Sequence, residues 1–158
     1  MPEIKIKTHP QITLVGLKYT GKNEAGEIPQ LWGKLMDYTI ENRDFSVPAG
    51  YGISIMDEQY EQTMIFDYIA GFAVTEVPMD LSEEMGNFTI PQGEYAVITC
   101  PNLENISKAY DAIYRWVAES SDYALDLSSG NFNFEYYGEE FAPPDSEKFY
   151  IYVPVKAK

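Results

Sequence analysis

The chain has 158 residues, of which 13 are tyrosine and eight are phenylalanine, and its formal net charge at pH 7 is −14. This length suits a single domain with a sizeable core. An acidic chain without a Lys/Arg cluster lacks the basic surface that direct nucleic-acid binding requires, so we exclude that function class.

Targeting and membrane segments are not expected. The first residues, Met-Pro-Glu-Ile-Lys-Ile-Lys, lack the apolar core of a secretory signal peptide. The longest apolar run, residues 65–74, contains Asp67 and is too short to cross a bilayer. Cys100 is the single cysteine, which excludes an internal disulfide framework, and it is expected to be a small buried hydrophobe. We therefore expect a cytoplasmic protein that makes no membrane contact.

The first part of the chain is predicted to form two strands and a helix. Alternating apolar residues indicate strands over residues 3–7 and 11–19, separated at His9 and the proline that follows it. His9 is expected in an exposed turn. Apolar residues at helical spacing predict a helix over residues 28–41, and Pro29 fits its first turn, where a missing N–H is harmless.

Two strands and a connecting segment are predicted next. The strands cover residues 51–56 and 64–76, and an acidic turn over residues 57–61 joins them. Residues 78–87 are polar and rich in turn formers. We interpret them as the link between two halves of the chain.

The second half repeats this order of elements. A strand is predicted over residues 88–100, with a bend at 91–93, and Asn102 or Asn105 is expected to cap a following helix that ends near Ser120. The helix stripe includes Ile106, Tyr110, Ile113, Tyr114, Trp116 and Val117, and the last strands are predicted over residues 131–137 and 148–155.

This order indicates a duplication, with pseudo-repeats at about 3–77 and 88–158. Each consists of a strand, a tryptophan-bearing helix and two more strands. The predicted fold class is α+β: duplicated βαββ units form an antiparallel sheet with both helices on one face, in a single domain over residues 1–158. Two similar halves side by side leave a cleft at their junction, where a ligand can bind.

Glu135 lies in the middle of the aromatic strand 131–137. Alternation directs Phe132, Phe134 and Tyr136 to one face and Asn133, Glu135 and Tyr137 to the other. A carboxylate at such a position is costly unless it is hydrogen-bonded, protonated or paired with a positive ligand. Both a structural glutamate and a ligand-binding glutamate fit this pattern.

Several short motifs occur in the order found in one known family. The chain resembles the GyrI-like small-molecule-binding domain, also called the AraC-type effector-binding domain of multidrug-responsive transcription regulators. The residues that carry the resemblance are Tyr51-Gly52-Ile53, Tyr68-Ile69-Ala70-Gly71, Ile90-Pro91-Gln92-Gly93-Glu94-Tyr95-Ala96-Val97, Trp116 and Phe134-Glu135-Tyr136.

The resemblance implies a bacterial protein with a central aromatic pocket and a buried glutamate as counter-charge for lipophilic, often cationic compounds. Glu135 matches that glutamate, and Tyr137 shares its face. Either Tyr150 or Tyr152 in the last strand is expected to reach the pocket, and Trp116 either closes it or packs in the core. The complete set of predicted ligand-binding residues is Glu135, Tyr137, Tyr68, Tyr95, Tyr150, Tyr152, Trp116, Tyr51 and Ile53.

The leading functional prediction is a stand-alone binding protein for hydrophobic, cationic small molecules, because nothing that resembles the regulators' helix-turn-helix domain precedes residue 3. The resemblance also admits a hydrolase of strained, electrophilic compounds, in which Glu135 is the general base and a pocket tyrosine such as Tyr137 donates a proton. A third possibility is an inhibitor that binds a basic protein partner such as DNA gyrase. No metal or organic cofactor is predicted.

Overall fold

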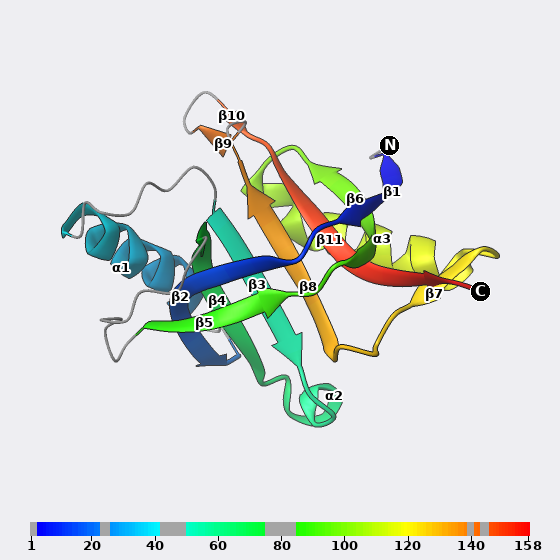
Figure 1. The fold of residues 1–158 in the computed structure, drawn as a ribbon, viewed down its shortest axis with the longest axis horizontal. Helices are drawn as coiled ribbons and strands as arrows, with labels where there is room; N and C mark the ends of the chain where they lie inside the picture. Colours follow the sequence, from blue (N-terminus) through cyan, green and yellow to red (C-terminus); the bar gives the residue numbers. More distant parts are fainter. Residues whose placement is uncertain (1–2, 23–25, 42–49, 75–84, 139–140, 143–145) are drawn as a thin grey trace.

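The computed structural model describes residues 3–22, 26–41, 50–74, 85–138, 141–142 and 146–158. Eleven strands and three α-helices are present in these ranges (Figure 1). The helices are α1 (Glu27–Glu41), α2 (Tyr60–Thr63) and α3 (Ile106–Glu119), and a 3-10 turn, Leu103–Asn105, precedes α3. The strands are β1 (Ile4–His9), β2 (Ile12–Gly21), β3 (Gly50–Met56), β4 (Phe66–Val74), β5 (Met85–Ile90), β6 (Gly93–Cys100), β7 (Tyr123–Leu125), β8 (Asn131–Tyr137), β9 (Phe141–Ala142), β10 (Ser146–Glu147) and β11 (Phe149–Ala157).

The main sheet has the strand order β1-β6-β11-β8-β3-β4-β2-β5, and neighbouring strands in this order are antiparallel. From β6 to β2 this order is symmetric about its centre. The strands of the second half, β6, β11 and β8, mirror those of the first half, β2, β4 and β3. The middle strands β3 and β8 are therefore neighbours, and the α+β fold with an antiparallel sheet is confirmed.

A two-stranded ribbon, formed by the consecutive strands β1 and β2 on one side and by β5 and β6 on the other, connects the two ends of the sheet. β1 pairs with β6, and β2, which follows β1 almost directly, pairs with β5, which precedes β6. Figure 1 shows this ribbon crossing in front of the central strands β3 and β8. β1, from the first half of the chain, thus pairs with β6 of the second half, and β5, which leads into the second half, pairs with β2 of the first.

Pairing registers define the two faces of the sheet. One row runs Leu17–Ala70–Gly52–Glu135–Ile151–Ile98 across six strands. Because side chains alternate along a strand, the adjacent row, which includes Ile53, Phe134 and Tyr152, lies on the opposite face.

Both long helices cover the Glu135 face, at opposite ends of the sheet. α1 packs through Leu35 on a core that includes Val15, Tyr68 and Phe72. α3 packs through Ala109, Ile113 and Val117 on residues of β6 and β11. The space over the central strands, between the two helices, is left for the site described below. The opposite face carries a third core, which includes Tyr51, Ile53, Tyr95, Phe132 and Phe134 beneath the ribbon.

The predicted elements mostly match the structure, with some corrections. Residues 85–87 belong to β5 instead of a connecting segment, and residues 78–84 of that segment lie outside the described residues. The strand predicted over 88–100 is two strands with a break at Pro91-Gln92. The short elements α2, β7, β9 and β10 were not predicted. Asn102 caps the turn before α3 by accepting a hydrogen bond from the Asn105 backbone N–H at 3.1 Å.

His9 also differs from its expected place in an exposed turn. It ends β1, is half-buried, and its ring contacts those of Tyr95, Phe134 and Tyr152 edge-on, with centroids 5.3–5.8 Å apart. Cys100 is buried, as expected. In the described part of the chain, no helix is long and apolar enough to span a membrane.

Candidate functional site

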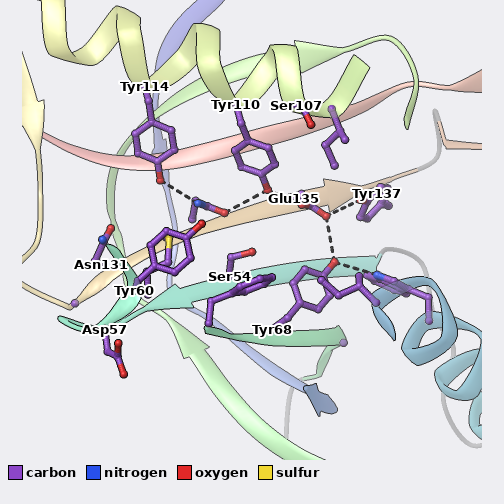
Figure 2. Close-up of a pocket in the computed structure, with 18 of the residues that line it drawn as sticks. Ser54, Asp57, Tyr60, Tyr68, Ser107, Tyr110, Tyr114, Asn131, Glu135 and Tyr137 are labelled. Atoms are coloured by element: carbon purple, nitrogen blue, oxygen red, sulfur yellow. Dashed lines mark hydrogen bonds between the residues drawn. The ribbon is translucent and has the colours of Figure 1, made fainter. Parts of the chain in front are cut away.

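A cavity of about 2190 Å³ lies between α1 and α3 over the middle of the sheet. Its floor comes from alternate residues of the two central strands, Gly50 and Ser54 in β3 and Asn133, Glu135 and Tyr137 in β8. α1 and α3 form its walls, and α2 borders one end. Figure 2 shows the polar side chains of both strands and helices converging on this space.

Glu135 is the centre of the cavity's hydrogen bonding. Its side chain is buried, with 5% of the residue exposed, and three tyrosines from three different elements donate to it. Tyr137 donates to Oε1 at 2.6 Å, Tyr68 donates to Oε1 at 3.1 Å, and Tyr110 donates to Oε2 at 2.5 Å. Trp32 of α1 donates in turn to the Tyr68 hydroxyl at 3.0 Å. The carboxylate therefore links both helices to the sheet (Figure 2).

Two glycines of β3 make room for this arrangement. A Cβ on Gly52 would lie 1.9 Å from the Tyr68 hydroxyl and 2.9 Å from Glu135 Oε1. A Cβ on Gly50 would lie 3.2 Å from the Trp32 ring. Because glycine has no side chain, the Tyr68 hydroxyl can cross β3 and reach the carboxylate of the neighbouring strand.

A second group of polar residues extends from Tyr110. The Tyr110 hydroxyl lies 3.3 Å from Asn133 Oδ1, and Asn133 Nδ2 donates to the Tyr114 hydroxyl at 2.9 Å. Asn133 is 3% exposed, so its amide needs these partners. The network thus runs along α3 from Glu135 toward the end of the cavity that α2 borders.

Burial controls the protonation of these groups. Removal from water raises the pKa of Glu135, and the hydrogen bonds from Tyr110, Tyr137 and Tyr68 act in the opposite direction without cancelling that effect. Burial, reinforced by the nearby Glu135 charge, raises the pKa of each of the three tyrosines. The tyrosines therefore stay neutral and act as hydrogen-bond donors.

The described lining of the cavity is acidic and contains no Lys, Arg or His. Besides Glu135, it includes Asp57, Glu58, Glu61 and Asp111, which are exposed and which we call the acidic rim. Among the described residues no cation pairs with Glu135, since both ion pairs there involve other carboxylates, Glu3 and Asp67. No group of three or more His, Cys, Asp or Glu side chains in the described ranges could hold a metal ion.

The structure brings three of the nine predicted site residues together. Glu135, Tyr137 and Tyr68 line the cavity and are hydrogen-bonded to one another. Alternation along β8 places Asn133, Glu135 and Tyr137 on the cavity side, in the arrangement that the sequence pattern predicts.

The other six predicted residues do not line this cavity. Tyr150 and Tyr152 occupy the same rows as Tyr136 and Phe134, so both point to the opposite face, and the expectation that one of them reaches the pocket is corrected. Trp116 is stacked on Tyr123 with ring centroids 6.5 Å apart and packs against the core beneath α3. Tyr51, Ile53 and Tyr95 belong to the core of the opposite face.

Four residues of the hydrogen-bond network in the cavity were not predicted as ligand-binding residues: Trp32, Tyr110, Tyr114 and Asn133. Tyr110 and Tyr114 were assigned to an apolar helix stripe, in which their rings fit but their hydroxyls need partners. The spacing of four residues between Tyr110 and Tyr114, on an otherwise mainly aliphatic helix face, was the feature of the sequence that could have identified them as cavity residues. Trp32 gave no comparable signal, because a tryptophan on an amphipathic helix usually packs in the core.

Comparison with known proteins gives one family match. Residues 5–155 match the model of the family Cass2, described as integron-associated effector binding protein. No curated protein sequence matches the chain.

Several solved structures share the fold over nearly their whole length. SAV2435 bound to tetraphenylphosphonium has a TM-score of 0.70 at 16% identity, covering 98% of this chain and 94% of that one. The integron cassette protein VCH_CASS2 of Vibrio cholerae has a TM-score of 0.62 at 18% identity, with 97% and 95% covered. The C-terminal domain of EcmrR has a TM-score of 0.74 at 15% identity, with 99% and 98% covered. At these identities the likeness establishes the fold alone.

Proposed function

Because the chain belongs to the family of integron-associated effector-binding proteins, we propose that it binds hydrophobic, positively charged small molecules in the cavity between α1 and α3. Glu135 is the counter-charge for the bound cation. The tyrosines and the tryptophan around it contact the apolar part of the ligand.

The single observation that carries this proposal is the state of the Glu135 carboxylate. It is buried and hydrogen-bonded only to neutral hydroxyl groups among the described residues. Burial of a charge without an opposite charge is costly, and hydrogen bonds offset only part of that cost. A cation in the cavity supplies the missing charge, and the attraction is strong because little water separates the two groups.

The remaining lining suits the apolar part of such a ligand. Aromatic rings within about 6 Å of a cation attract it, by about 0.5–2 kcal/mol each. Exposed apolar residues at the cavity, Leu103 and Leu127, extend this surface toward solvent. The aromatic residues of the lining are Trp32, Tyr60, Phe66, Tyr68, Tyr110, Tyr114, Tyr137 and Phe141.

The comparison with SAV2435 supports the charge of the ligand. That protein, which shares this fold, is described as bound to tetraphenylphosphonium, a cation surrounded by four phenyl rings. The volume of the cavity here, about 2190 Å³, exceeds the roughly 300–1,000 Å³ of ordinary ligand pockets, so its volume is sufficient for a ligand of that size.

Calorimetric titration tests the proposal. Wild type and Glu135→Gln are titrated with tetraphenylphosphonium and with the neutral triphenylphosphine oxide. We expect Glu135→Gln to weaken binding of the cation by roughly tenfold or more, because a charge-assisted interaction of about 1.5–3 kcal/mol is lost. Binding of the neutral compound should change little.

Glu94→Gln is the matched control, because Glu94 is an exposed glutamate of β6 outside the cavity lining and its loss changes the net charge equally. It should bind the cation as wild type does. Equal affinity of wild type and Glu135→Gln for the cation would contradict the proposal.

A hydrolase is the second candidate function. The observation that favours it is a carboxyl group of raised pKa with tyrosine hydroxyls at 2.5 and 2.6 Å, since a general base and a proton donor are then adjacent. In this scheme Glu135 takes a proton from a water that attacks an electrophilic carbon, Tyr137 protonates the leaving atom, and the proton on Glu135 passes to Tyr137 over the 2.6 Å between them, which restores both groups. Product formation from strained electrophiles, lost in both Glu135→Gln and Tyr137→Phe, would establish it.

Binding to a basic protein partner stays a prediction from the net charge. A pull-down whose yield falls sharply at modest salt concentration would support it, because salt screens exposed charges.

A further inference from the structure

The described lining of the cavity carries negative charge and no positive group. Glu135 is buried on the floor, and the four carboxylates of the acidic rim are exposed. A buried charge without an opposite charge is costly. Because no described lining residue can neutralise Glu135, a proton on its carboxyl group is the simplest way to remove that cost before a ligand binds.

Three tyrosines face the Glu135 carboxyl group from three elements, and all of them are neutral. Tyr68 of β4, Tyr137 of β8 and Tyr110 of α3 place their hydroxyl oxygens at 2.5–3.1 Å from it (Figure 2). Burial raises the pKa of each hydroxyl. None of the three is therefore a source of protons near neutral pH.

Cys100 is the other titratable group that the described strands place close to Glu135. It lies in β6 on the Glu135 face of the sheet, two residues beyond the row of that side chain. Its thiol donates to the Asn102 carbonyl at 3.0 Å, and burial raises its pKa, so it also stays neutral. The neighbours of Glu135 in β3 and β11 are Gly52 and Ile151, which do not titrate.

The hydrogen bonds of Glu135 fit a neutral carboxyl group as well as a carboxylate. Oε1 accepts from Tyr137 and from Tyr68, and the second direction is fixed because the Trp32 indole, which can only donate, binds the Tyr68 oxygen. Oε2 has the Tyr110 hydroxyl as its one partner among the described residues. A hydroxyl can donate or accept, so this contact persists when Oε2 carries a proton.

We propose that the cavity exchanges a proton for its ligand: Glu135 is protonated before binding and releases this proton to water when a hydrophobic cation binds. The proposal rests on the cation-binding function proposed above and adds its regulation by pH. One positive charge leaves as another enters, so the carboxyl group and its partner together have no net charge in either state. The cost of an uncompensated buried charge is avoided throughout.

This exchange makes the affinity for cations depend on pH. The bound cation stabilises the carboxylate, so it lowers the pKa of Glu135 relative to the ligand-free protein. Protons are released at pH values between these two pKa values. Over that range the affinity should rise with pH by up to about tenfold per pH unit, and it should level off once Glu135 is ionised without ligand.

Calorimetric titration with tetraphenylphosphonium between about pH 5 and pH 8 measures both effects. This cation has no proton to lose, so protons released on binding come from the protein. Each titration is made in two buffers of different ionisation enthalpy, and the difference in heat gives the number of protons released. We expect a maximum of about 0.5–1 proton per bound cation, together with the rise in affinity.

Three comparisons identify the source of the proton. The neutral triphenylphosphine oxide should bind wild type without releasing protons. Glu135→Gln should bind the cation more weakly, without proton release and with an affinity that does not change with pH. Cys100→Ser is the matched control, because it replaces the nearby thiol with a hydroxyl that can still donate to the Asn102 carbonyl. This variant should release as many protons as wild type.

Binding of the cation to wild type without proton release over this range would overturn the exchange and leave the cation-binding function intact. Equal release with the neutral oxide or in Glu135→Gln, or loss of release in Cys100→Ser, would also overturn it, since another group would then supply the proton. If Glu135→Gln binds neither compound, the comparison of cation and oxide in wild type still decides. If wild type does not bind the cation at any pH, the cation-binding function itself fails.

Discussion

At the scale of single residues, Glu135 departs from the rule that buried side chains are apolar. Its row across the sheet is otherwise Leu17, Ala70, Gly52, Ile151 and Ile98. A hydrophobic residue at position 135 would fill this row at no electrostatic cost. The three tyrosine donors reduce the cost of the carboxylate without supplying an opposite charge. Glu135 therefore makes the free energy of unfolding lower than an apolar residue at this position would, and this is the position where a ligand is expected to bind.

This cost predicts a pH dependence of stability. The pKa of Glu135 is raised in the folded protein, so the folded state holds this proton more tightly than the unfolded state. The resulting stabilisation is complete below the carboxyl's ordinary pKa, about 4.3, and is lost as the pH rises through the folded-state pKa. Each unit by which the folded-state pKa exceeds the ordinary value corresponds to about 1.4 kcal/mol.

Thermal melts of wild type and Glu135→Gln between pH 4 and pH 8 measure this effect. Subtraction of the two curves removes the titration of the other carboxylates. We expect the stability of wild type relative to Glu135→Gln to fall as the pH rises, with Glu135→Gln equal or more stable near pH 8. A difference that is constant, or that grows in favour of wild type with rising pH, would contradict the raised pKa.

The sequence predicts the residues of β8 better than those of the neighbouring strands. Alternation within 131–137 assigns Glu135 and Tyr137 to one face, and the structure has them there. The face of Tyr150 and Tyr152 depends instead on which residue of β11 pairs with Glu135, and that residue is Ile151. Register between strands distant in sequence follows from three-dimensional packing, so a pattern within one strand cannot supply it.

At the scale of elements, the two long helices and the central strands were predictable because each has a clear apolar period. α2, β7, β9 and β10 have two to four residues each and bury too few side chains to produce such a period. The break between β5 and β6 at Pro91-Gln92 was expected as a bend within one strand. The pairing of the β1–β2 strand run with β5–β6 could not be anticipated, because it joins different halves of the chain.

Gly52 of β3 should not tolerate a side chain. A Cβ there would lie 1.9 Å from the Tyr68 hydroxyl, so Tyr68 has to leave Glu135 or the two strands have to separate. We expect Gly52→Ala to lower the free energy of unfolding by about 1–3 kcal/mol, as for the loss of a buried hydrogen bond. Denaturant unfolding measures this change.

Gly86→Ala is the matched control for that experiment, since Gly86 is also a strand glycine, and no described atom lies within 4 Å of its Cβ position. Its stability should equal that of wild type or exceed it slightly, because alanine loses less backbone entropy on folding. Equal unfolding free energies for the two variants would show that Tyr68 does not depend on the space at Gly52.

α2 ends with a non-glycine residue in the left-handed conformation. Met64 has φ = 61° and is 55% exposed, and its N–H donates to the Tyr60 carbonyl as a C-cap. Glycine adopts this conformation without the steric cost that a Cβ carries, about 1–2 kcal/mol. Met64→Gly should therefore raise the free energy of unfolding by up to about 1 kcal/mol, and Met64→Ala, which keeps the Cβ, should not. Urea titrations that find Met64→Gly less stable than Met64→Ala would refute this account.

At the scale of the whole molecule, the proposed function means that a cationic ligand would approach a protein whose net charge is −14. Most of the acidic residues that the structure describes lie outside the cavity lining, and at physiological salt the field of an exposed charge is screened within about 8 Å. The acidic rim lies at the cavity itself, on both the α2 side and α3. If the proposed function holds, the rim is expected to act on the association rate, and Glu135, as the proposed counter-charge of the bound ligand, on the dissociation rate.

This division of roles is testable by stopped-flow binding of a fluorescent lipophilic cation at several salt concentrations. In the triple variant Asp57→Asn, Glu58→Gln, Glu61→Gln, the association rate at low salt should fall several-fold, and the rates of variant and wild type should converge near 0.5 M salt, where the screening length is short. The dissociation rate should change little, because the Glu135 contacts are intact.

The control for that experiment neutralises three exposed carboxylates outside the cavity lining, by Glu94→Gln, Glu119→Gln and Asp122→Asn. It removes the same net charge, so an effect of total charge alone would slow association equally in both triple variants. A slower association confined to the rim variant would instead locate the steering field at the cavity entrance. A rim variant with wild-type association and faster dissociation would show that these carboxylates touch the bound ligand, which would extend the site from Glu135 to α2.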